Sequence, residues 1–599
     1  MAESTVGCAS RGGSSDFAES WRTFAEAANY EESPTYDETV AYAQRLAKRS
    51  PWVRYAAFGE SARGREMPLL VLSKHGDFSA AKTVRSELPT VLIINCIHAG
   101  ECAGKDASLA LARDIAIEKS KADLLDSANL LIVPIYNVDG HERRSAHSRI
   151  NQNGPREMGW RTTATNLNLN RDFAKADAVE TQALLRLIRD WQPDVIVDAH
   201  TTNGSDHQYD MLYGATLYPP AGKQVVEWTR AALTETILPQ MKSAGYPTMI
   251  YAGPRERDNL ASGLQASVDF SPRYSTGYGA VLDRPTFLLE AHALKPYARR
   301  VVSSYEMMAG ILRHANKDGA ALRAMTRAID RDYASRNGAD DGGAIVLESE
   351  ITDVGSPFEY LAKRSSTRPS ELTGGDVIVY EDQPDTVATT MYDKARVTKA
   401  MQPRAAYVMP PEWTNIAARL MLHGIEVRRV TAATQCDAQV YRFSDVSFPP
   451  RTFEGRTQPV AKGAWSAEQV EVVAGSFLVP MNQPRAKLAA HLLEPEAPDS
   501  FLAWGFFNAI FERKEYAESY VFEPIAAGML KEDAALRAEY EEKVKSDAAF
   551  AGNPRARLYF LYDRSAYRDA QWMLYPVVRV EDDAARAVLV KESVAYRPF

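Results

Sequence analysis

The chain has 599 residues and a formal net charge of −8, with 45% hydrophobic and 25% charged residues. This composition is ordinary for a globular protein, and the length exceeds what one hydrophobic core usually serves. The small negative charge gives no reason to expect a nucleic acid or an anionic membrane as partner. No apolar run approaches the roughly 18 residues of a membrane-spanning helix, so no transmembrane segment is expected.

The N-terminal stretch 1–30 is small and polar, and it lacks the basic start and apolar middle of a signal peptide. We expect this stretch to be disordered or removed by processing. The four cysteines, Cys8, Cys96, Cys102 and Cys436, are too few for a disulfide framework in a chain of this size. A bond between Cys96 and Cys102 stays open as the one local pairing.

Apolar strands alternate with amphipathic helices over about residues 30–330. The first helix is predicted where "SPTYDE" supplies a start signal before an apolar stripe of Val40, Ala43, Leu46 and Ala47. Strands without polar alternation, separated by helices, indicate a mostly parallel sheet covered on both faces. The predicted strands cover 67–74, 90–97, 128–137, 193–200 and 284–292, and the later helices cover 105–119, 178–191, 222–245 and 297–318.

The sequence pattern changes near residue 340. Strands become shorter and more alternating, as in "AIVLESEITD", and the stretch "SRNGADDGG" is typical of a linker. We therefore expect one α/β region at 31–335 and an accessory α+β region at 345–599, in one or two domains. The predicted fold class is α/β, a mixed, mostly parallel sheet flanked by helices, with this C-terminal region added.

Three of the predicted strands end in side chains that bind metals or move protons. His98 and Glu101 follow one strand, His200 ends a second, and Glu290 ends a third. Parallel strands bring their carboxyl ends to one edge of a sheet, where ligand sites form. These four side chains are therefore expected to lie close together.

Two imidazoles and one carboxylate are the protein ligands of many catalytic zinc ions, which keep one position for water. A tight turn can bring His98 and Glu101 to one side, and the glycines Gly100 and Gly104 suit such a turn. His200 would complete the set from a neighbouring strand. The sequence predicts one Zn²⁺ ion here, with Glu290 as the general base that accepts a proton from the bound water.

Each signal is weak alone, because HxxE pairs are common and a histidine at a strand end is more often structural. The joint occurrence at three strand ends favours the metal. The chain contains no HExxH, GxSxG, P-loop or GxGxxG motif. The sequence therefore lacks the central motifs of serine hydrolases and of nucleotide-dependent enzymes.

Six motifs follow one another over about residues 40–310. They are "HAGE" at 98–101, "NVDG" at 137–140, "GWR" ending at Arg161, "NLNRDF" at 168–173, "DAH" ending at His200 and "LLEAHALKPY" at 288–297. In this order and spacing they resemble the zinc carboxypeptidase family (peptidase M14, the funnelins), although the turn "NVDG" lacks the usual proline. The resemblance implies a metalloprotease with its catalytic domain at 31–335, and a larger bacterial member with extra C-terminal domains.

The resemblance assigns roles to further residues. Arg171, with the amide of Asn170, would bind the C-terminal carboxylate of a peptide or peptide-like substrate. Arg161 would stabilise the oxyanion of the tetrahedral intermediate, with Arg149 as the alternative. A carboxypeptidase, which removes residues from the C-terminus, is therefore the favoured activity.

Substrate selection is expected from the loop around 250–280, as the resemblance implies. Tyr274 and Tyr278, in the glycine-bearing "PRYSTGYG", are the candidates for a mobile tyrosine that closes over the substrate. Asp198 precedes His200 by two residues and is a candidate to orient that imidazole. Charged residues of both signs occur in the loop, so the side-chain preference stays open.

Other functions fit parts of the pattern. A zinc amidohydrolase that releases an acyl group from an amino acid, or a hydrolase of cell-wall peptides, would use the same residues. A non-catalytic peptide-binding protein, or a transport or adhesion protein whose C-terminal half carries the function, would belong to other classes. Because larger bacterial members are exported, we expect a periplasmic or secreted protein, or a cytoplasmic one if the N-terminus is native. The sequence does not determine the oligomeric state.

Overall fold

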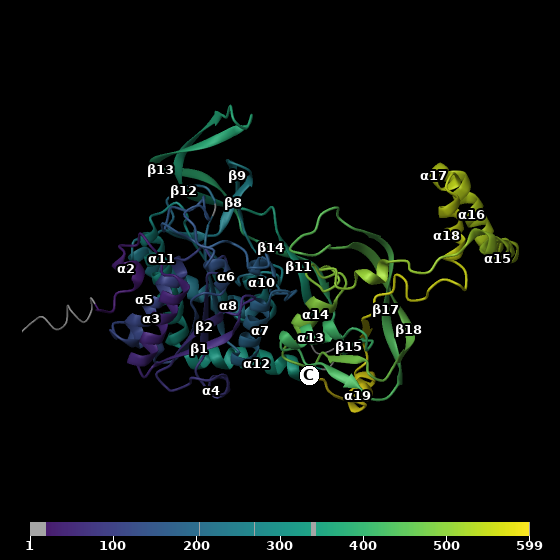
Figure 1. Cartoon of the computed structure of the whole chain (residues 1–599), viewed down its shortest axis with the longest axis horizontal. Helices are drawn as coiled ribbons and strands as arrows, with labels where there is room; N and C mark the ends of the chain where they lie inside the picture. The colour runs from purple at the N-terminus through teal and green to yellow at the C-terminus, as the bar shows by residue number, and fades with distance from the viewer. Residues whose placement is uncertain (1–19, 203, 269, 337–342, 598–599) are drawn as a thin grey trace, which may run out of the picture.

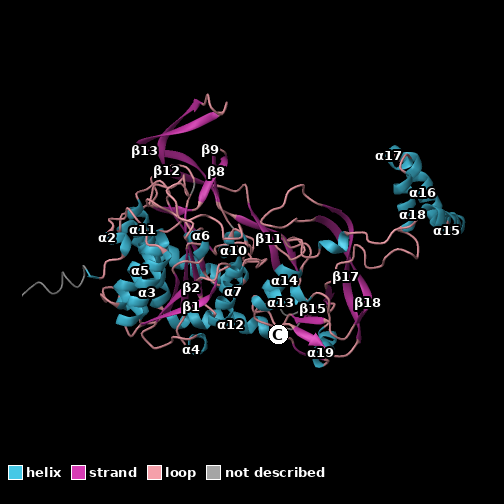
Figure 2. Ribbon diagram, viewed as in Figure 1, coloured by secondary structure: helices cyan, strands magenta, loops and turns pink. Residues whose placement is uncertain are grey.

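The computed structural model describes residues 20–202, 204–268, 270–336 and 343–597. A mixed eight-stranded sheet forms the centre of the N-terminal half, in the order β1-β2-β4-β3-β5-β10-β6-β7 (Figures 1 and 2). Four of its seven pairings are parallel, including the central ones from β4 through β3 and β5 to β10. The strands are β1 (Val53–Glu60), β2 (Glu66–Leu72), β3 (Thr90–Asn95), β4 (Asn129–Val133), β5 (Val195–Thr201), β6 (Met211–Ala215), β7 (Thr248–Ile250) and β10 (Thr286–Ala291).

Helices cover both faces of this sheet, which confirms the predicted fold class. Successive side chains of a strand point to opposite faces, so Val91 and Ile93 enter one core cluster while Leu92 and Ile94 enter another. The first face packs against α3 (Tyr36–Arg49), α5 (Ala103–Ala116), α8 (Lys223–Ala231), η3 (Ala232–Ile237), α9 (Leu238–Ser243) and α11 (Tyr297–Lys317). The second face packs against α7 (Val179–Trp191) and α10 (Ser275–Val281) of the same half.

The first residues that the structure describes are ordered, whereas the sequence predicts disorder there. Residues 1–19 lie outside the described residues, but residues 20–30 fold onto the body and include α2 (Phe24–Ala27). Trp21 is buried, and the Glu26 carboxylate accepts a hydrogen bond from Arg113 of α5 at 2.5 Å. The prediction of disorder is therefore wrong for residues 20–30, because a polar sequence gains order here from a docking site in the tertiary structure.

The C-terminal half adds three sheets and two groups of helices. A seven-stranded sheet, in the order β18-β17-β20-β15-β19-β16-β21, packs with α13 (Thr414–Leu422), α14 (Ala486–Leu493) and α19 (Asp583–Lys591). Figure 1 shows that a helical group, α15 (Ser519–Glu532) to α18 (Pro554–Tyr562), stands apart from this body. The strands of the large sheet are β15 (Ala406–Met409), β16 (Arg428–Val430), β17 (Thr434–Ser447), β18 (Val460–Val472), β19 (Phe477–Pro480), β20 (Val578–Val580) and β21 (Ser593–Ala595).

The expected linker lies between α12 (Gly319–Ser335) and β11 (Ile345–Ile351). Elements from the two sides of this linker pair and pack with one another. In the four-stranded sheet β12-β13-β9-β8, Met391 of β13 pairs with Leu264 of β9. The second core cluster likewise joins strands β2 to β5 with α13 and α14. The C-terminal half is thus packed against the N-terminal sheet. The remaining strands are β8 (Ala252–Glu256), β9 (Asn259–Ala266), β12 (Ser356–Pro369), β13 (Asp376–Tyr392) and β14 (Ala395–Met401).

Within the described part of the chain, no helix combines the length and apolar content that crossing a bilayer requires.

Gly104 lets α5 approach the sheet directly behind the strand ends. A Cβ atom at Gly104 would lie 2.4 Å from the Cβ of Ala199 in β5 and 2.7 Å from the Oδ1 of Asn95. We expect Gly104→Ala to lower the free energy of unfolding by ~1–3 kcal/mol through overpacking, as measured by urea unfolding. The matched control is Gly528→Ala in α15, where no atom lies within 4 Å of the new methyl group. There the expected change is neutral or stabilising, and equal losses in both variants would contradict the packing argument.

Candidate metal centre and substrate cleft

The carboxylate of Glu101 lies between two imidazoles. Its Oε1 is 3.0 Å from the Nδ1 of His98, and its Oε2 is 3.1 Å from the Nδ1 of His200. All three side chains are buried, and one ligand atom from each lies within 4.8 Å of the others. The structure therefore brings together the three residues that the sequence pattern singles out as metal ligands.

Local backbone structure explains this convergence. β3 ends at Asn95, Cys96 adopts a left-handed φ of 57°, and the Glu101 amide donates to the His98 carbonyl at 2.9 Å to close the turn. β5 lies beside β3 in parallel, so His200 near its carboxyl end faces that turn. The Thr201 amide donates to Glu101 Oε2 at 2.9 Å, which fixes the carboxylate to the strand.

The two histidines experience different electrostatic surroundings. Burial lowers the pKa of His98 to about 4, against the pull of the Glu101 carboxylate. Burial also opposes protonation of His200, but the Asp198 and Glu101 carboxylates outweigh it and raise its pKa well above the usual value. His200 is therefore the more basic of the two imidazoles.

The donor set fits a divalent metal ion. Both Nδ1 atoms face the same carboxylate, and the Nε2 of His200 lies 3.0 Å from the Oδ2 of Asp198. Such an outer carboxylate orients a ligand imidazole and raises its basicity. Two imidazoles with one carboxylate form a three-ligand zinc set that keeps a position for water. His98, Glu101 and His200 are the described residues that would hold the ion.

Glu290 lies next to this set on the neighbouring strand. In the parallel pairing of β10 with β5, Glu290 is the direct partner of His200, so both side chains emerge on the same face of the sheet. Glu290 is 8% exposed, and Leu288 two residues earlier shares its face. A carboxylate at this position faces the metal ligands from the side.

Two arginines approach Glu101. The Nη2 of Arg149 donates to Oε1 at 2.7 Å, whereas the Nη1 of Arg161 lies 3.9 Å from the same atom. The Arg149 side chain is 7% exposed and that of Arg161 is 35% exposed. Burial lowers the pKa of Arg161, with opposing effects from Glu101 and Glu290 and a further lowering by Arg149 and Arg171. Arg161 is therefore the more open guanidinium, placed among the charges of the site.

The short 3₁₀ turn η2 (Leu169–Arg171) carries a third guanidinium, that of Arg171. Arg171 donates to the Asn170 carbonyl at 2.6 Å, and its guanidinium lies 4.5 Å from the centre of the Tyr274 ring. Asn170, Arg171 and Tyr274 are all partly exposed. The arrangement can present a planar cation, with an aromatic ring beside it, to an anionic group.

Tyr278 does not belong to this surface, which corrects the expectation that it contacts substrate. It is 1% exposed in α10, and its hydroxyl lies 2.9 Å from the Nδ1 of His423. The Phe173 ring packs against its other side, with ring centres 5.6 Å apart. The helical period turns Tyr278 into the interface with the C-terminal half, whereas Tyr274 at the helix cap stays near the cleft.

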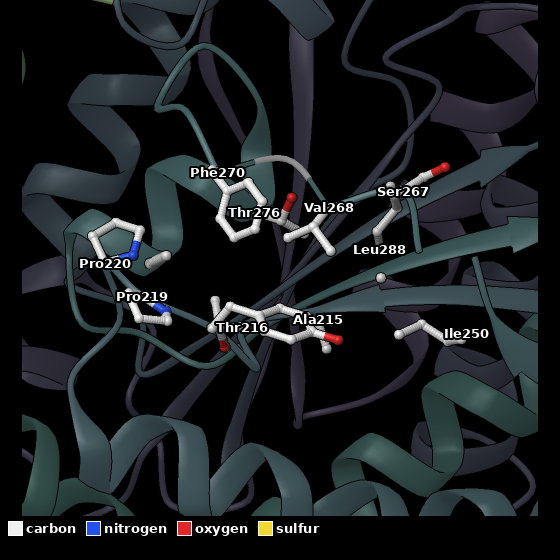
Figure 3. A pocket seen from close by; sticks show the side chains of 13 residues that line it. Ala215, Thr216, Pro219, Pro220, Ile250, Ser267, Val268, Phe270, Thr276 and Leu288 are labelled. Atoms are coloured by element: carbon white, nitrogen blue, oxygen red, sulfur yellow. The ribbon is translucent and has the colours of Figure 1, made fainter. Parts of the chain in front are cut away.

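A pocket opens beside the Glu290 strand. Figure 3 shows Val268, Phe270 and Thr276 on one side of it and Thr216 and Pro219 on the other. None of the described residues that line it carries a charge. The full lining is Gly214, Ala215, Thr216, Tyr218, Pro219, Pro220, Ile250, Ser267, Val268, Phe270, Thr276, Ala280 and Leu288.

A second buried cluster lies behind the metal turn, with Cys96, Cys102 and His141 close enough to share an ion. The ammonium of Lys105, however, lies 3.1 Å from the Nε2 of His141 and donates to the Pro34 carbonyl at 2.6 Å. This buried cation already occupies the imidazole lone pair that a metal would need. Both thiols are free, so the Cys96–Cys102 pair that the sequence left open is not formed.

Comparison with known proteins agrees with this geometry. Residues 39–246 match the zinc carboxypeptidase family, so the chain contains a zinc carboxypeptidase domain. It is similar to Carboxypeptidase 2 of Trichophyton equinum, at 26% identity over 492 residues, 79% of this chain and 84% of the relative. Carboxypeptidase 2 of Trichophyton rubrum is also 26% identical over 492 residues, with the same coverage of both chains. Because 79% of the chain exceeds its first 335 residues, both similarities extend into the C-terminal half.

Two solved structures match the chain more weakly. A metallo-carboxypeptidase from Burkholderia cenocepacia is 20% identical, covering 47% of this chain and 70% of its own, with a TM-score of 0.36. A metallo-carboxypeptidase from Pseudomonas aeruginosa, in complex with (2-guanidinoethylmercapto)succinic acid, is 18% identical, covering 47% of this chain and 68% of its own, with a TM-score of 0.35.

We expect His200→Ala to abolish stoichiometric zinc binding, because it removes one of three ligand atoms. Asp198→Asn keeps all three ligands, so zinc should still bind, but about 10–100-fold more weakly. Metal analysis after dialysis and competition with a chelator measure both effects. The control is His75→Ala, which removes an exposed histidine remote from the site. Unchanged zinc content in His200→Ala would exclude this metal centre.

Proposed function

We propose that the chain is a zinc metallocarboxypeptidase, a hydrolase that removes residues from the C-terminus of peptides. The main supporting observation is that the Nδ1 atoms of His98 and His200 both lie next to the Glu101 carboxylate, and that Glu290 lies on the adjacent strand. When bound there, zinc would supply a Lewis acid and a water of lowered pKa. The remaining chemistry belongs to the side chains around it.

Glu290 is the proposed general base. Its carboxylate lies on the face of the sheet that carries His200, at the wall of a cleft and mostly shielded from water. There it would accept a proton from the attacking water and then deliver it to the leaving amine, so one group serves both halves of the reaction.

Arg161 is the proposed oxyanion donor. Its guanidinium is partly exposed and senses the charges of Glu101 and Glu290, which supports a position facing the reacting carbonyl. A fixed cation at this place would stabilise the negative charge that develops on the carbonyl oxygen. Arg149 is buried against Glu101, so its proposed role is to hold that ligand in place.

Arg171 and Asn170 are the proposed anchor for the terminal carboxylate. A guanidinium offers paired donors that match a carboxylate, and the Asn170 amide offers another. Tyr274 beside Arg171 would cover the bound residue. An anchor for a free carboxylate next to the metal centre favours cleavage of the last peptide bond over cleavage within a chain.

The pocket lined by Leu288 and Phe270 is the proposed site for the last side chain of the substrate. It opens on the face of β10 that carries Glu290, two residues along the strand. Its described lining is uncharged, so burying an apolar side chain gains free energy there, whereas a charged one loses its hydration. We further propose that the enzyme acts on peptides outside the cytoplasm, as its resemblance to exported bacterial enzymes suggests.

Glu290→Gln is expected to lower kcat by about 10²–10⁴-fold, because the amide cannot accept the proton. Zinc content should stay at one ion per chain, since Glu290 is not a proposed ligand. The measurement is hydrolysis of an N-acylated dipeptide combined with metal analysis of the same sample. Full activity in the variant would exclude Glu290 as the base, and loss of zinc would assign it to the metal site instead.

A series of N-acylated dipeptides tests the pocket. Substrates ending in Leu or Phe should show kcat/KM at least tenfold higher than those ending in Arg or Glu, because the charged side chains would be desolvated without a partner. Mass spectrometry of longer peptides should show stepwise loss of single C-terminal residues. A preference for Arg or Glu would contradict the proposed pocket, and internal cleavage would contradict the carboxylate anchor.

A further inference from the structure

Residues of the C-terminal half hold a segment that lies between two parts of the proposed substrate site. This segment, Ser271–Tyr274, connects the pocket residue Phe270 to the ring of Tyr274 beside Arg171. It has no regular secondary structure before α10 begins at Ser275. Its conformation therefore depends on contacts with other parts of the chain.

Asp499 makes the central contact, 226 residues further along the chain. Its side chain is fully buried, and its Oδ2 accepts a hydrogen bond from the Arg273 amide at 2.9 Å. Its Oδ1 accepts from the Nε of Arg273 at 2.7 Å, and the Ser271 hydroxyl also donates to Oδ2. One carboxylate thus binds both the backbone and two side chains of the segment, with charge-assisted hydrogen bonds.

Aromatic rings of the C-terminal half hold the other side of Arg273. Its guanidinium lies 4.9 Å from the centre of the Trp504 ring, and Phe453 stacks on Trp504 at 6.0 Å. The Arg273 side chain is only 19% exposed. A cation between a buried carboxylate and an indole has little freedom to move.

The same segment reaches the proposed carboxylate anchor. The Arg273 carbonyl accepts a hydrogen bond from the Phe173 amide at 3.3 Å, two residues after Arg171. The Tyr274 ring lies against the Arg171 guanidinium. Displacing Arg273 would therefore shift both Tyr274 and the loop that carries Arg171.

We propose that Asp499 is a positioning residue for substrate binding, so that the C-terminal half completes the substrate site of the N-terminal domain. This inference rests on the proposed function, because it assigns Asp499 a role in that site. A segment held in its bound conformation pays less ordering entropy when substrate binds. Asp499 contacts no reacting atom and acts through Arg273 and Tyr274.

The test is Asp499→Asn in the full-length chain, which keeps the size of the side chain and removes its charge. With an N-acylated dipeptide that has a free carboxylate, we expect KM to rise about tenfold while kcat stays within about twofold. Combining Asp499→Asn with Arg171→Ala should raise KM little beyond Arg171→Ala alone, because both changes disturb one anchor. A purely structural role would instead lower thermal stability and the active fraction, with KM unchanged.

Glu494→Gln is the matched control. Glu494 is also a fully buried carboxylate of the C-terminal half, and it pairs with Arg579 and Tyr407 of that same half. Its loss should lower the melting temperature and leave KM unchanged. Ser271→Ala, which removes one of the three donors to Asp499, provides a milder variant with an expected rise in KM of about threefold.

The outcomes separate the two proposals. If Arg171→Ala raises KM but Asp499→Asn and Ser271→Ala do not, the positioning role is wrong and the proposed function stands. If Asp499→Asn does not fold, Ser271→Ala alone decides, and an unchanged KM overturns the inference. If the wild-type protein with its zinc hydrolyses no peptide, the proposed function fails, and the role of Asp499 fails with it.

Discussion

The carboxylate of Glu101 is the group on which the rest of the site depends. Burial alone would raise its pKa, but the imidazoles of His98 and His200, with Arg149, hold that pKa well below the usual value. A buried anion with this many donors fixes the distances between the segments that supply them. The turn after β3, the end of β5 and the segment carrying Arg149 are thereby held around one point.

The two faces of the central sheet differ near this carboxylate. Side chains such as Val197 and Ala199 enter a core closed by helices, whereas Asp198 and His200 alternate with them and lie on the opposite face. In β10, Leu289 likewise enters this core, whereas Glu290 lies on the same face as His200. Both faces thus carry a core, and the second face also supplies the proposed ligands, base and pocket residues. Close packing of the first face holds the second in place, because a strand cannot move one face without the other.

The C-terminal half lies on the face that carries the site. His423 binds Tyr278, and Lys487 donates hydrogen bonds to the carbonyls of Pro220 and Ala280, two residues of the pocket wall. Arg456 forms a paired hydrogen bond with Asp177, in the loop that follows Arg171. These buried polar contacts need fixed geometry to offset the loss of hydration, so they set the position of the pocket walls. The similarity to curated carboxypeptidases also reaches into this half.

The sequence by itself determined the α/β class, the central strands and the grouping of His98, Glu101, His200 and Glu290. These follow from local patterns, since an apolar strand must be buried and its carboxyl end must reach the edge of the sheet. Only the tertiary structure decided that residues 20–30 are ordered, that Tyr278 is buried, and that Asp499 contacts the cleft segment. Each of these depends on a partner more than 80 residues away, and no local periodicity records which distant surface will cover a side chain.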